Sequence, residues 1–370
     1  MRYFIIYLRF LKKHTLRVHL TFIVSSLRLS GGVLAVTEFA TRLAARGHEV
    51  SIVAPRDAVD ESVARRLEPS VTIREAGTGA KPTLGLAAKL KLGLALARAV
   101  PPDSMVMATH TPTTPVALLA SWKNGRRPFW FYQDYLEMFA VRPFEQGLLR
   151  LMPRFFHEVL VVSGSSADEI KRYGARRVTV VRQGISDAAF FHPPVDPASR
   201  ERGLLLYLGD MRPRKGLFDF LSAAERLYPS EPGLRLTIVS KDECRIDTRV
   251  PFDFYYRPPR QALAELYRRC AVFVSASWWE SFGLPPLEAM ACGAPVVLTQ
   301  SRGVSEYAVP GQNCLMVSPR DPPALADAIQ RVLRDAALAR RLSEAGPPTA
   351  RGFHWDDCVD RFEAALLNPG

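Results

Sequence analysis

Strand-like and helix-like segments alternate along the chain from about residue 18. Residues 18–25 form a short run rich in β-branched residues, which is typical of a buried parallel strand. After Gly31 and Gly32 the apolar residues recur at helical spacing, and Gly47 stands where a helix C-cap belongs. Residues 50–53 then begin another strand. This pattern predicts a βαβ unit.

The alternation is interrupted once and then begins again. Residues 190–197 contain three prolines in a short polar stretch, which indicates a linker. Asp321, followed by Pro322, is expected to cap a late helix. Strands are predicted before the linker at 105–108, 129–132, 159–163 and 178–181, and after it at 204–208, 234–239, 272–276 and 295–298. Helices are predicted from 217 and over 260–269 and 284–291.

The pattern therefore predicts two α/β domains with parallel sheets and a cleft between them. We place the first domain at residues 1–192, with a basic extension over 1–16, and the second at 198–350. A closing helix is expected within 353–370. Ligands in such sheets bind at the carboxyl ends of the strands, close to helix N-termini.

Composition agrees with a folded chain of this size and narrows its partners. The 370 residues are 48% hydrophobic and 23% charged, which argues against disorder. Lys and Arg outnumber Asp and Glu by 49 to 37, a formal charge of +12, which favours phosphorylated small molecules, acidic membranes or nucleic acid. We expect no nucleic-acid binding, because no basic–aromatic stripe or known module appears.

The five cysteines are widely spaced, and no Cys-x-x-Cys pair occurs, so we expect buried free thiols rather than disulfides or a metal site. They are Cys244, Cys270, Cys292, Cys314 and Cys358. Apolar residues near the N-terminus are too few to cross a bilayer. Residues 1–16 are thus either a frayed extension or a basic segment lying on an anionic membrane. We expect a cytoplasmic protein, with peripheral attachment to the membrane left open.

Candidate chemistry is concentrated in residues 280–295, which follow an apolar strand and open a helix. Glu280 is placed at the carboxyl end of the strand. Phe282, Gly283 and Leu284 offer backbone N–H groups at a helix N-terminus, a suitable seat for a diphosphate. Glu288 lies about one turn into the helix, where it can accept hydrogen bonds from sugar hydroxyls. Two carboxylates beside a diphosphate require hydroxyl or cationic partners.

This segment, ESFGLPPLEAMACGAPVV, resembles the paired-glutamate motif (Glu, seven residues, Glu) of the retaining glycosyltransferase family four. Residues 206–216, LYLGDMRPRKG, resemble the strand and loop of that family that carry cations for the donor diphosphate. Gly31 and Gly32 resemble its N-terminal glycine-rich loop. The resemblance covers about residues 17–367 and is strongest over 204–317. The donor cations it implies are Arg212, Arg214 and Lys215.

The resemblance implies the GT-B fold, in which two Rossmann-like domains face each other across a cleft, one for the acceptor and one for the donor. It also implies transfer with retention, without a metal or other cofactor. The expected partners are a nucleotide-diphosphate sugar and a glycan or lipid-linked acceptor of cell-surface polysaccharide or glycolipid synthesis. Glu280 would orient the sugar and Glu288 would hold the ribose.

Three departures from the family are visible. Asp210 stands where an arginine is common, so Arg212 or Arg214 would have to take its place. Ser281 replaces a common glycine. Gln133 replaces a histidine that contacts the transferred sugar, and it cannot titrate. Asp134 beside it is the one carboxylate we name for a covalent intermediate.

Other interpretations stay open at this stage. His110 follows a strand, but a single histidine there is more often structural. A nucleotide-sugar epimerase has the same two-domain fold, and the departures at Asp210 and Gln133 leave room for an inactive relative that binds glycans or nucleotides.

Overall fold

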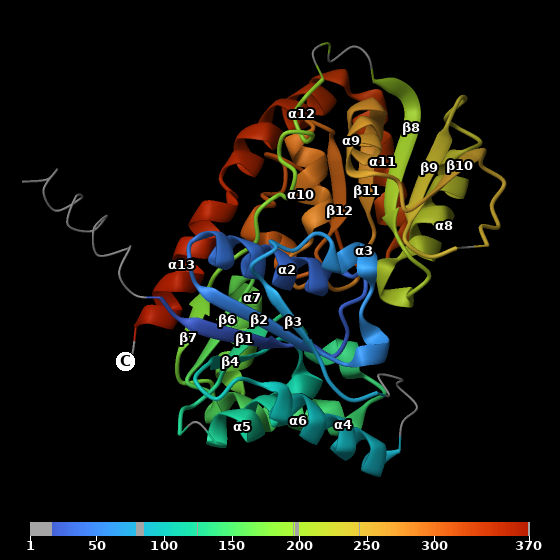
Figure 1. Ribbon diagram of the computed structural model, residues 1–370. Coiled ribbons are helices and arrows are strands. Elements are labelled where there is room, and N and C mark those ends of the chain that lie inside the picture. Colours follow the sequence, from blue (N-terminus) through green and yellow to red (C-terminus); the bar gives the residue numbers. More distant parts are fainter. Residues whose placement is uncertain are drawn as a thin grey trace, which may run out of the picture. The chain divides into compact units, whose positions relative to one another are not determined.

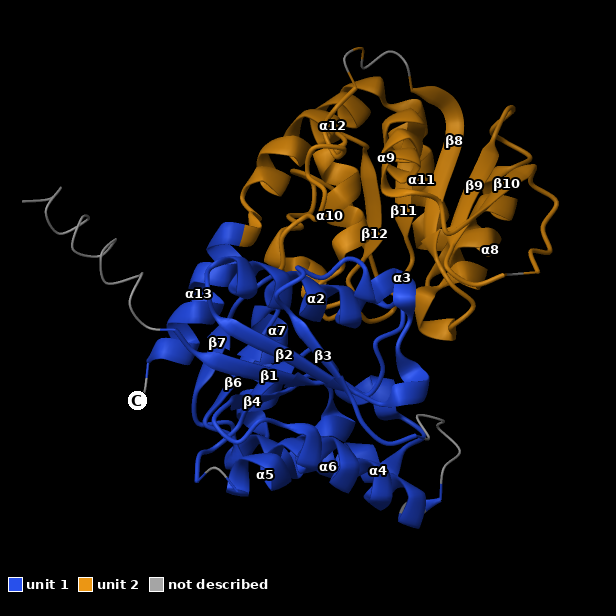
Figure 2. Cartoon of the chain, in the orientation of Figure 1, with its two compact units in different colours: residues 1–182, 356–370 blue, residues 183–355 orange. Residues whose placement is uncertain are grey.

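The computed structural model describes residues 17–78, 85–123, 125–194, 196, 200–243 and 245–368. The basic extension 1–16 and Cys244 lie outside these residues. The chain forms two compact units (Figure 2): unit 1 takes in residues up to 182 together with the C-terminal segment from 356, and unit 2 takes in 183–355. The segment between 183 and 192 thus belongs to unit 2.

Unit 1 is built on a parallel sheet with strand order β3-β2-β1-β4-β5-β6-β7. The strands are β1 (His19–Ile23), β2 (Glu49–Ala54), β3 (Thr72–Glu75), β4 (Met105–Ala108), β5 (Phe129–Tyr132), β6 (Glu158–Val161) and β7 (Val178–Val180). The helices are α2 (Gly31–Ala45), α3 (Glu61–Ala64), α4 (Leu86–Ala99), α5 (Thr114–Lys123), α6 (Pro143–Leu151), α7 (Gly164–Arg172) and α13 (Trp355–Leu367).

Alternating side chains of the central strands build the two layers of this unit. On one face, Phe39 of α2 stacks on Phe362 of α13, with 4.5 Å between ring centroids, and both contact Phe131 of β5. The neighbouring Trp130 and Tyr132 point to the other face, where α4, α5, α6 and α7 complete an apolar core. Figure 1 shows α4, α5 and α6 below the sheet and α2 above it. The C-terminal helix is therefore part of the core of unit 1.

Unit 2 has a second parallel sheet, with strand order β10-β9-β8-β11-β12-β13. The strands are β8 (Glu201–Gly209), β9 (Arg235–Ser240), β10 (Phe252–Tyr256), β11 (Cys270–Ser275), β12 (Val296–Thr299) and β13 (Leu315–Val317). The helices are α8 (Leu217–Leu227), α9 (Arg260–Arg269), α10 (Leu284–Ala291), α11 (Pro322–Arg334) and α12 (Ala336–Arg351). Helices α8 and α11 cover one face, α9 and α10 pack on the other, and α12 contacts both α10 and α11.

The predicted strands all appear within a few residues of their expected bounds, and Asp321 caps α11 by accepting from the N–H of Ala324. One local prediction was wrong. Gly31 and Gly32 are not in a loop but are the first two residues of α2, whose N-cap is Ser30. Glycine is tolerated there because the first N–H groups of a helix have no intrahelical partner to lose.

Candidate active site

Two adjacent strands of unit 2 bring together a cluster of charged side chains. β8 and β11 pair in the sheet, so the loops that follow Gly209 and Ser275 leave the same edge. Lys215 of the short helix η6 (Pro213–Lys215) donates to Glu280, with 2.6 Å between Nζ and Oε1. Nη1 of Arg214 lies 3.9 Å from Oε2 of the same carboxylate. Three predicted donor-site residues therefore lie in contact.

The cations beside Glu280 keep its carboxyl group ionised. Burial by itself raises the pKa of Glu280, but the charges of Lys215 and Arg214 outweigh burial and hold it below its ordinary value. One carboxylate with two cations leaves a surplus of positive charge at the strand ends. Such a cluster can accept an anionic ligand without leaving the partly buried carboxylate unpaired.

The N-terminus of α10 adds backbone donors to this cluster. Its N-cap, Gly283, has φ +85°, and the Gly283 carbonyl accepts from the hydroxyl of Tyr307. Pro285 and Pro286 occupy the next turn and carry no N–H. The N–H groups at this helix end are thus those of Leu284 and of the residues just before it, Phe282 and Gly283.

A strained turn holds the backbone of Glu280 in place. Arg302 has φ +63° and ψ −79°, and the N–H of Gly303 donates to the carbonyl of Ser301 at 3.0 Å, the geometry of a classic γ-turn. The same N–H donates to the carbonyl of Glu280 at 3.0 Å, and the N–H of Glu280 donates to Ser301. Strain in a non-glycine residue is typical of functional sites. Sequence reasoning did not identify this turn.

Glu288 is buried and has two polar partners that the sequence did not reveal. Arg260 of α9 donates to Oε1 at 2.8 Å, and the hydroxyl of Tyr267 donates to Oε2 at 3.2 Å. Glu280 and Glu288 thus each have a cationic partner, as two carboxylates beside a diphosphate require. A cation in the first turn of a helix opposes the helix dipole. Arg260 at the start of α9 was therefore a signal available in the sequence.

Asp210, the main departure from the family pattern, is paired with Arg212, two residues further along the chain. Nε of Arg212 lies 2.8 Å from Oδ1 and Nη2 lies 2.5 Å from Oδ2 of Asp210. Burial raises the pKa of Asp210, but the hydrogen bonds and charge of Arg212 lower it below its ordinary value. Of the two arginines considered as substitutes, Arg214 is the one in the Glu280 cluster.

Unit 1 has a cluster at the carboxyl ends of β1, β4 and β5, and hydrogen bonds hold the described residues of this cluster together. The carboxylate of Asp134 is buried and accepts from Thr111 twice, at 2.6 Å from N–H and 2.7 Å from Oγ1. Nε2 of Gln133 donates to the carbonyl of Gly32 at 3.2 Å. The ring of His110 lies so close to Gly32 that an added Cβ would be 3.1 Å from Nε2. Gln133 and Gly32 therefore lie in contact next to Asp134, and Thr111 is a partner of Asp134 that the sequence did not reveal.

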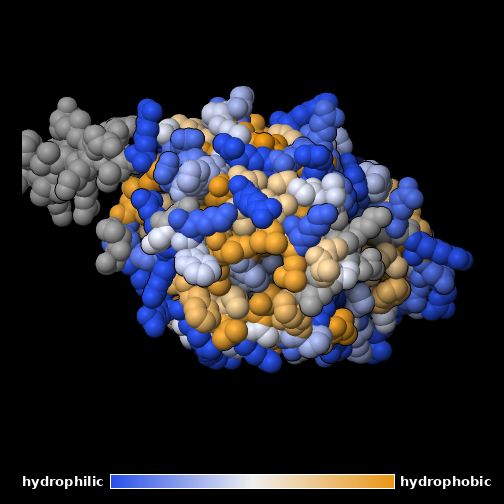
Figure 3. Space-filling model, turned by 60° about the horizontal axis from the view of Figure 1, so that its bottom comes forward, coloured by the Kyte–Doolittle hydropathy of each residue, from blue (hydrophilic) through white to orange (hydrophobic). Residues whose placement is uncertain are grey.

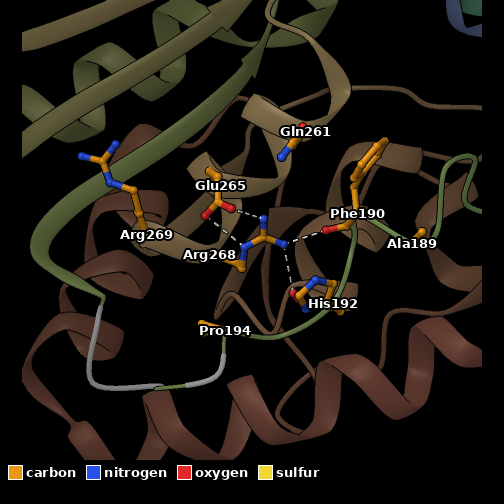
Figure 4. Close-up of a pocket in the computed structure, with 8 residues that line it drawn as sticks. All are labelled: Ala189, Phe190, His192, Pro194, Gln261, Glu265, Arg268 and Arg269. Carbon is orange, nitrogen blue, oxygen red and sulfur yellow. Dashed lines mark hydrogen bonds and ion pairs between the residues drawn. The ribbon is translucent and has the colours of Figure 1, made fainter.

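A separate pocket of about 490 Å³ lies where residues 189–194 run along α9 (Figure 4). The guanidinium of Arg268 points toward it but donates to Glu265, at 2.5 Å, and to the carbonyl of Phe190, at 2.6 Å. These contacts anchor the segment after residue 183 to α9. The pocket shares no residue with the Glu280 cluster.

The described residues include no group of three or more side chains that could hold a metal ion. Four cysteines, Cys270, Cys292, Cys314 and Cys358, are free and buried, as predicted. Burial raises the pKa of each of these thiols to about 12, so they are unreactive in the folded chain. Within the same described ranges, no helix is long and apolar enough to cross a membrane.

Each half of the chain matches a family model. Residues 29–189 match Glycosyltransferase Family 4, and residues 192–348 match Glycosyl transferases group 1. A D-inositol 3-phosphate glycosyltransferase of Acidothermus cellulolyticus is 33% identical over 214 residues, which are 51% of this chain and 48% of the relative. O-antigen chain mannosyltransferase B of Escherichia coli is 29% identical over 240 residues, 57% of this chain and 62% of the relative. The chain thus spans about half the length of the first curated relatives it matches.

Solved structures resemble the chain over nearly its whole length. A sucrose-phosphate synthase of Thermosynechococcus elongatus has a TM-score of 0.81 at 20% identity and covers 95% of this chain and 98% of its own. HepE of Anabaena in complex with UDP-glucose has a TM-score of 0.78 at 17% identity and covers 95% of this chain and 99% of its own. At these identities the likeness concerns the fold, and the predicted GT-B architecture of two Rossmann-like domains is confirmed.

Proposed function

Since the chain belongs to the family-four and group-1 glycosyltransferases, we propose that it transfers a sugar from a nucleotide-diphosphate sugar to a hydroxyl acceptor. The observation that carries the proposal is the contact of Lys215 and Arg214 with Glu280, next to the N-terminus of α10. This arrangement offers cations and backbone N–H groups to a diphosphate, and a carboxylate to sugar hydroxyls.

The charged cluster supports a division of roles within unit 2. Lys215, Arg214 and the N–H groups from Phe282 to Leu284 would stabilise the departing diphosphate. Glu280, kept ionised by its neighbours, would orient the sugar and balance developing positive charge at the anomeric carbon. Glu288, fixed by Arg260 and Tyr267, would accept from the ribose hydroxyls.

We further propose that transfer retains the anomeric configuration and needs neither a metal nor another cofactor. The cationic side chains at the strand ends support this, because they can neutralise the leaving group themselves. In this mechanism the acceptor attacks from the leaving-group face and a diphosphate oxygen takes its proton. Gln133 and Asp134 of unit 1 would then contact the transferred sugar or the acceptor, and a covalent step through Asp134 is the competing route.

For the substrates, the relatives supply a starting point. HepE of Anabaena was solved with UDP-glucose and with UDP, which supports UDP sugars as the first donors to test. The O-antigen chain mannosyltransferase supports a glycan or lipid-linked acceptor of the cell surface. We propose a cytoplasmic enzyme working at the cytoplasmic face of the membrane. An epimerase has no support among these relatives.

Thermal unfolding with UDP, GDP, ADP, dTDP and NAD tests the donor site directly. One nucleoside diphosphate at about one hundred times its Kd should add about 2.7 kcal/mol to the free energy of unfolding. Glu288→Ala should lose this stabilisation, whereas Glu344→Ala, an exposed glutamate on α12, should keep it. No response to any diphosphate would identify an inactive relative instead.

Product analysis then tests the mechanism. With the donor base known, NMR of the glycoside formed should show the anomeric configuration of the donor, and EDTA should leave the rate unchanged. An inverted product, or activity that is lost with EDTA and restored by a divalent ion, would contradict the proposed chemistry.

A further inference from the structure

Large apolar side chains are exposed on one restricted part of unit 1. In the described part of that unit, every exposed large hydrophobic residue lies between Leu90 and Phe155. Trp122 is 82% exposed, Val141 90% and Phe144 62%. The full set is Leu90, Leu94, Trp122, Met138, Val141, Phe144, Leu151 and Phe155. Apolar groups gathered in this way are uncommon on a surface that faces only water.

The elements that carry these side chains form a continuous layer. Helix α4 packs against α5, α5 against the short helix η4 (Met152–Phe155), and η4 against α6. The layer lies at the bottom of Figure 1, and Figure 3 turns this side forward, showing apolar side chains gathered in its middle with polar ones around them. We call this layer the α4–α6 face.

Two helices of this face carry exposed apolar residues as well as buried ones. On α4, Leu90 and Leu94 are one turn apart and both exposed, whereas Leu96 and Ala97, which follow them in the helix, are buried. On α6, Phe144 and Leu151 are two turns apart, while Leu148 and Leu149 supply the buried side. Both helices are thus apolar on the core side and partly apolar on the outer side.

The charges on the same stretch are almost all positive. Among the described residues from 85 to 157, the exposed acidic side chain is Asp103. The exposed basic side chains are Lys89, Lys91, Arg98, Lys123, Arg126, Arg127, Arg142, Arg150 and Arg154. Lys and Arg extend their apolar stems along a surface and their charges outward, which suits contact with phosphate head groups.

A second copy of the chain fits this face poorly. A two-fold interface pairs a patch with itself, so these cations would face one another. An anionic bilayer instead offers negative head groups to the cations and a hydrocarbon boundary to the aromatic and aliphatic tips. We propose that the α4–α6 face docks the protein on an anionic lipid membrane. This inference does not depend on the proposed reaction.

Vesicle binding by the full chain tests the proposal. The double change Val141→Asp with Phe144→Asp should weaken binding to vesicles of phosphatidylcholine and phosphatidylglycerol at least about tenfold. Each change removes an apolar side chain that would be buried in the membrane and adds a negative charge. The matched control is Phe218→Asp in unit 2, whose side chain is 61% exposed, and it should bind like the wild type.

Neutralising cations of the α4–α6 face gives a second test. Lys89→Gln, Lys91→Gln and Arg98→Gln together should weaken binding about fivefold for each cation removed, and wild-type binding should fall with added salt. Arg340→Gln with Arg341→Gln on α12 removes exposed cations from unit 2 and should change little. Vesicles of phosphatidylcholine alone should bind much more weakly than the anionic ones.

Trp122 provides a direct readout on folded protein. Its fluorescence, taken as the difference between wild type and Trp122→Phe, should be quenched by brominated lipid in anionic vesicles. No quenching would overturn the proposal. So would binding that is unaffected by the Val141 and Phe144 changes but lost when Arg9, Lys12 and Lys13 become Gln, or a dimer that forms through this face in place of vesicle binding.

Discussion

The polar clusters of the two units lie at corresponding places, the carboxyl ends of parallel strands, but they hold their carboxylates in different ways. In unit 2, Glu280 is paired with Lys215 and Arg214, and Glu288 with Arg260. In unit 1, Asp134 is held by the N–H and hydroxyl of Thr111. The same strand-end geometry thus serves an ionic site in one unit and a hydrogen-bonded site in the other.

The difference indicates what each cluster can recognise. A site with surplus cations binds a charged group and loses strength with salt, whereas hydrogen-bond donors and acceptors without such a surplus select neutral hydroxyls by geometry. This is the distinction expected between a nucleotide-diphosphate group and sugar hydroxyls. The predictions below change members of these clusters or glycines at the helix N-termini beside them.

The largest effect is expected from Lys215→Met. Removal of a cation aimed at developing negative charge should lower kcat/KM about 10²–10³-fold. The exposed Lys171→Met on α7 should be silent. Initial rates with the donor found by thermal shift measure both variants. A loss below about threefold would contradict the role of Lys215.

Stability separates this role from a structural one. Lys215→Met leaves the partly buried Glu280 carboxylate with one cation fewer, so the free energy of unfolding should fall. Adding Glu280→Gln should restore stability without restoring activity. If the double variant regains both, Lys215 serves only to neutralise Glu280.

In unit 1, Asp134→Ala should mainly destabilise. It leaves the N–H and hydroxyl of Thr111 without their acceptor, which costs about 1–3 kcal/mol for each buried donor. Asp134→Asn keeps an oxygen in place and should cost about 1 kcal/mol, as urea unfolding can show. A loss of turnover in Asp134→Asn as large as in Lys215→Met, at unchanged stability, would favour the covalent route.

Gly283 at the N-terminus of α10 and Gly31 at the N-terminus of α2 sharpen the comparison further. Gly283 has φ +85°, and an added Cβ would lie 2.9 Å from Cγ1 of Val304. Gly31 has no heavy atom within 4 Å of an added Cβ. Gly283→Ala should therefore lower Tm and reduce the free energy of unfolding by about 1–3 kcal/mol. Gly31→Ala should leave the free energy of unfolding unchanged or raise it by about 0.4–1 kcal/mol. Equal effects would contradict the view that only the α10 end is conformationally constrained.

The sequence predicted the sheets well, because buried parallel strands are short apolar runs whose position needs no knowledge of partners. The strands it missed, β3, β10 and β13, lie at sheet edges, where β3 and β10 are partly exposed and their residues mix polar with apolar. The cluster around Glu280 was also predictable, because its members lie in two short segments. Phe282, Gly283 and Leu284 follow one another along the chain.

What the sequence could not supply is contact across long separations. Arg260 and Tyr267 reach Glu288 from the neighbouring helix, and Thr111 reaches Asp134 from another strand end. Neither pairing has a local pattern, because it depends on which strands are adjacent. Arg302 was missed for another reason, since a strained φ is imposed by the surrounding loop and is not encoded by arginine itself.

The smallest predicted effect concerns pH and isolates the ionic character of the unit 2 cluster. The folded-state pKa of Glu280 lies below its ordinary value of 4.5, which applies to the unfolded chain. Between these two values the unfolded chain binds more protons, so this carboxylate stabilises the fold above pH 4.5 and loses that contribution as pH falls through the folded pKa.

Urea unfolding of wild type and Glu280→Gln between pH 7 and pH 3 should therefore give curves of unfolding free energy against pH whose difference is constant at high pH and shrinks below about pH 4.5. The slope from one group cannot exceed about 1.4 kcal/mol per pH unit. Parallel curves over the whole range would mean that Lys215 and Arg214 do not hold the carboxylate ionised, and the contrast between the two clusters would be lost.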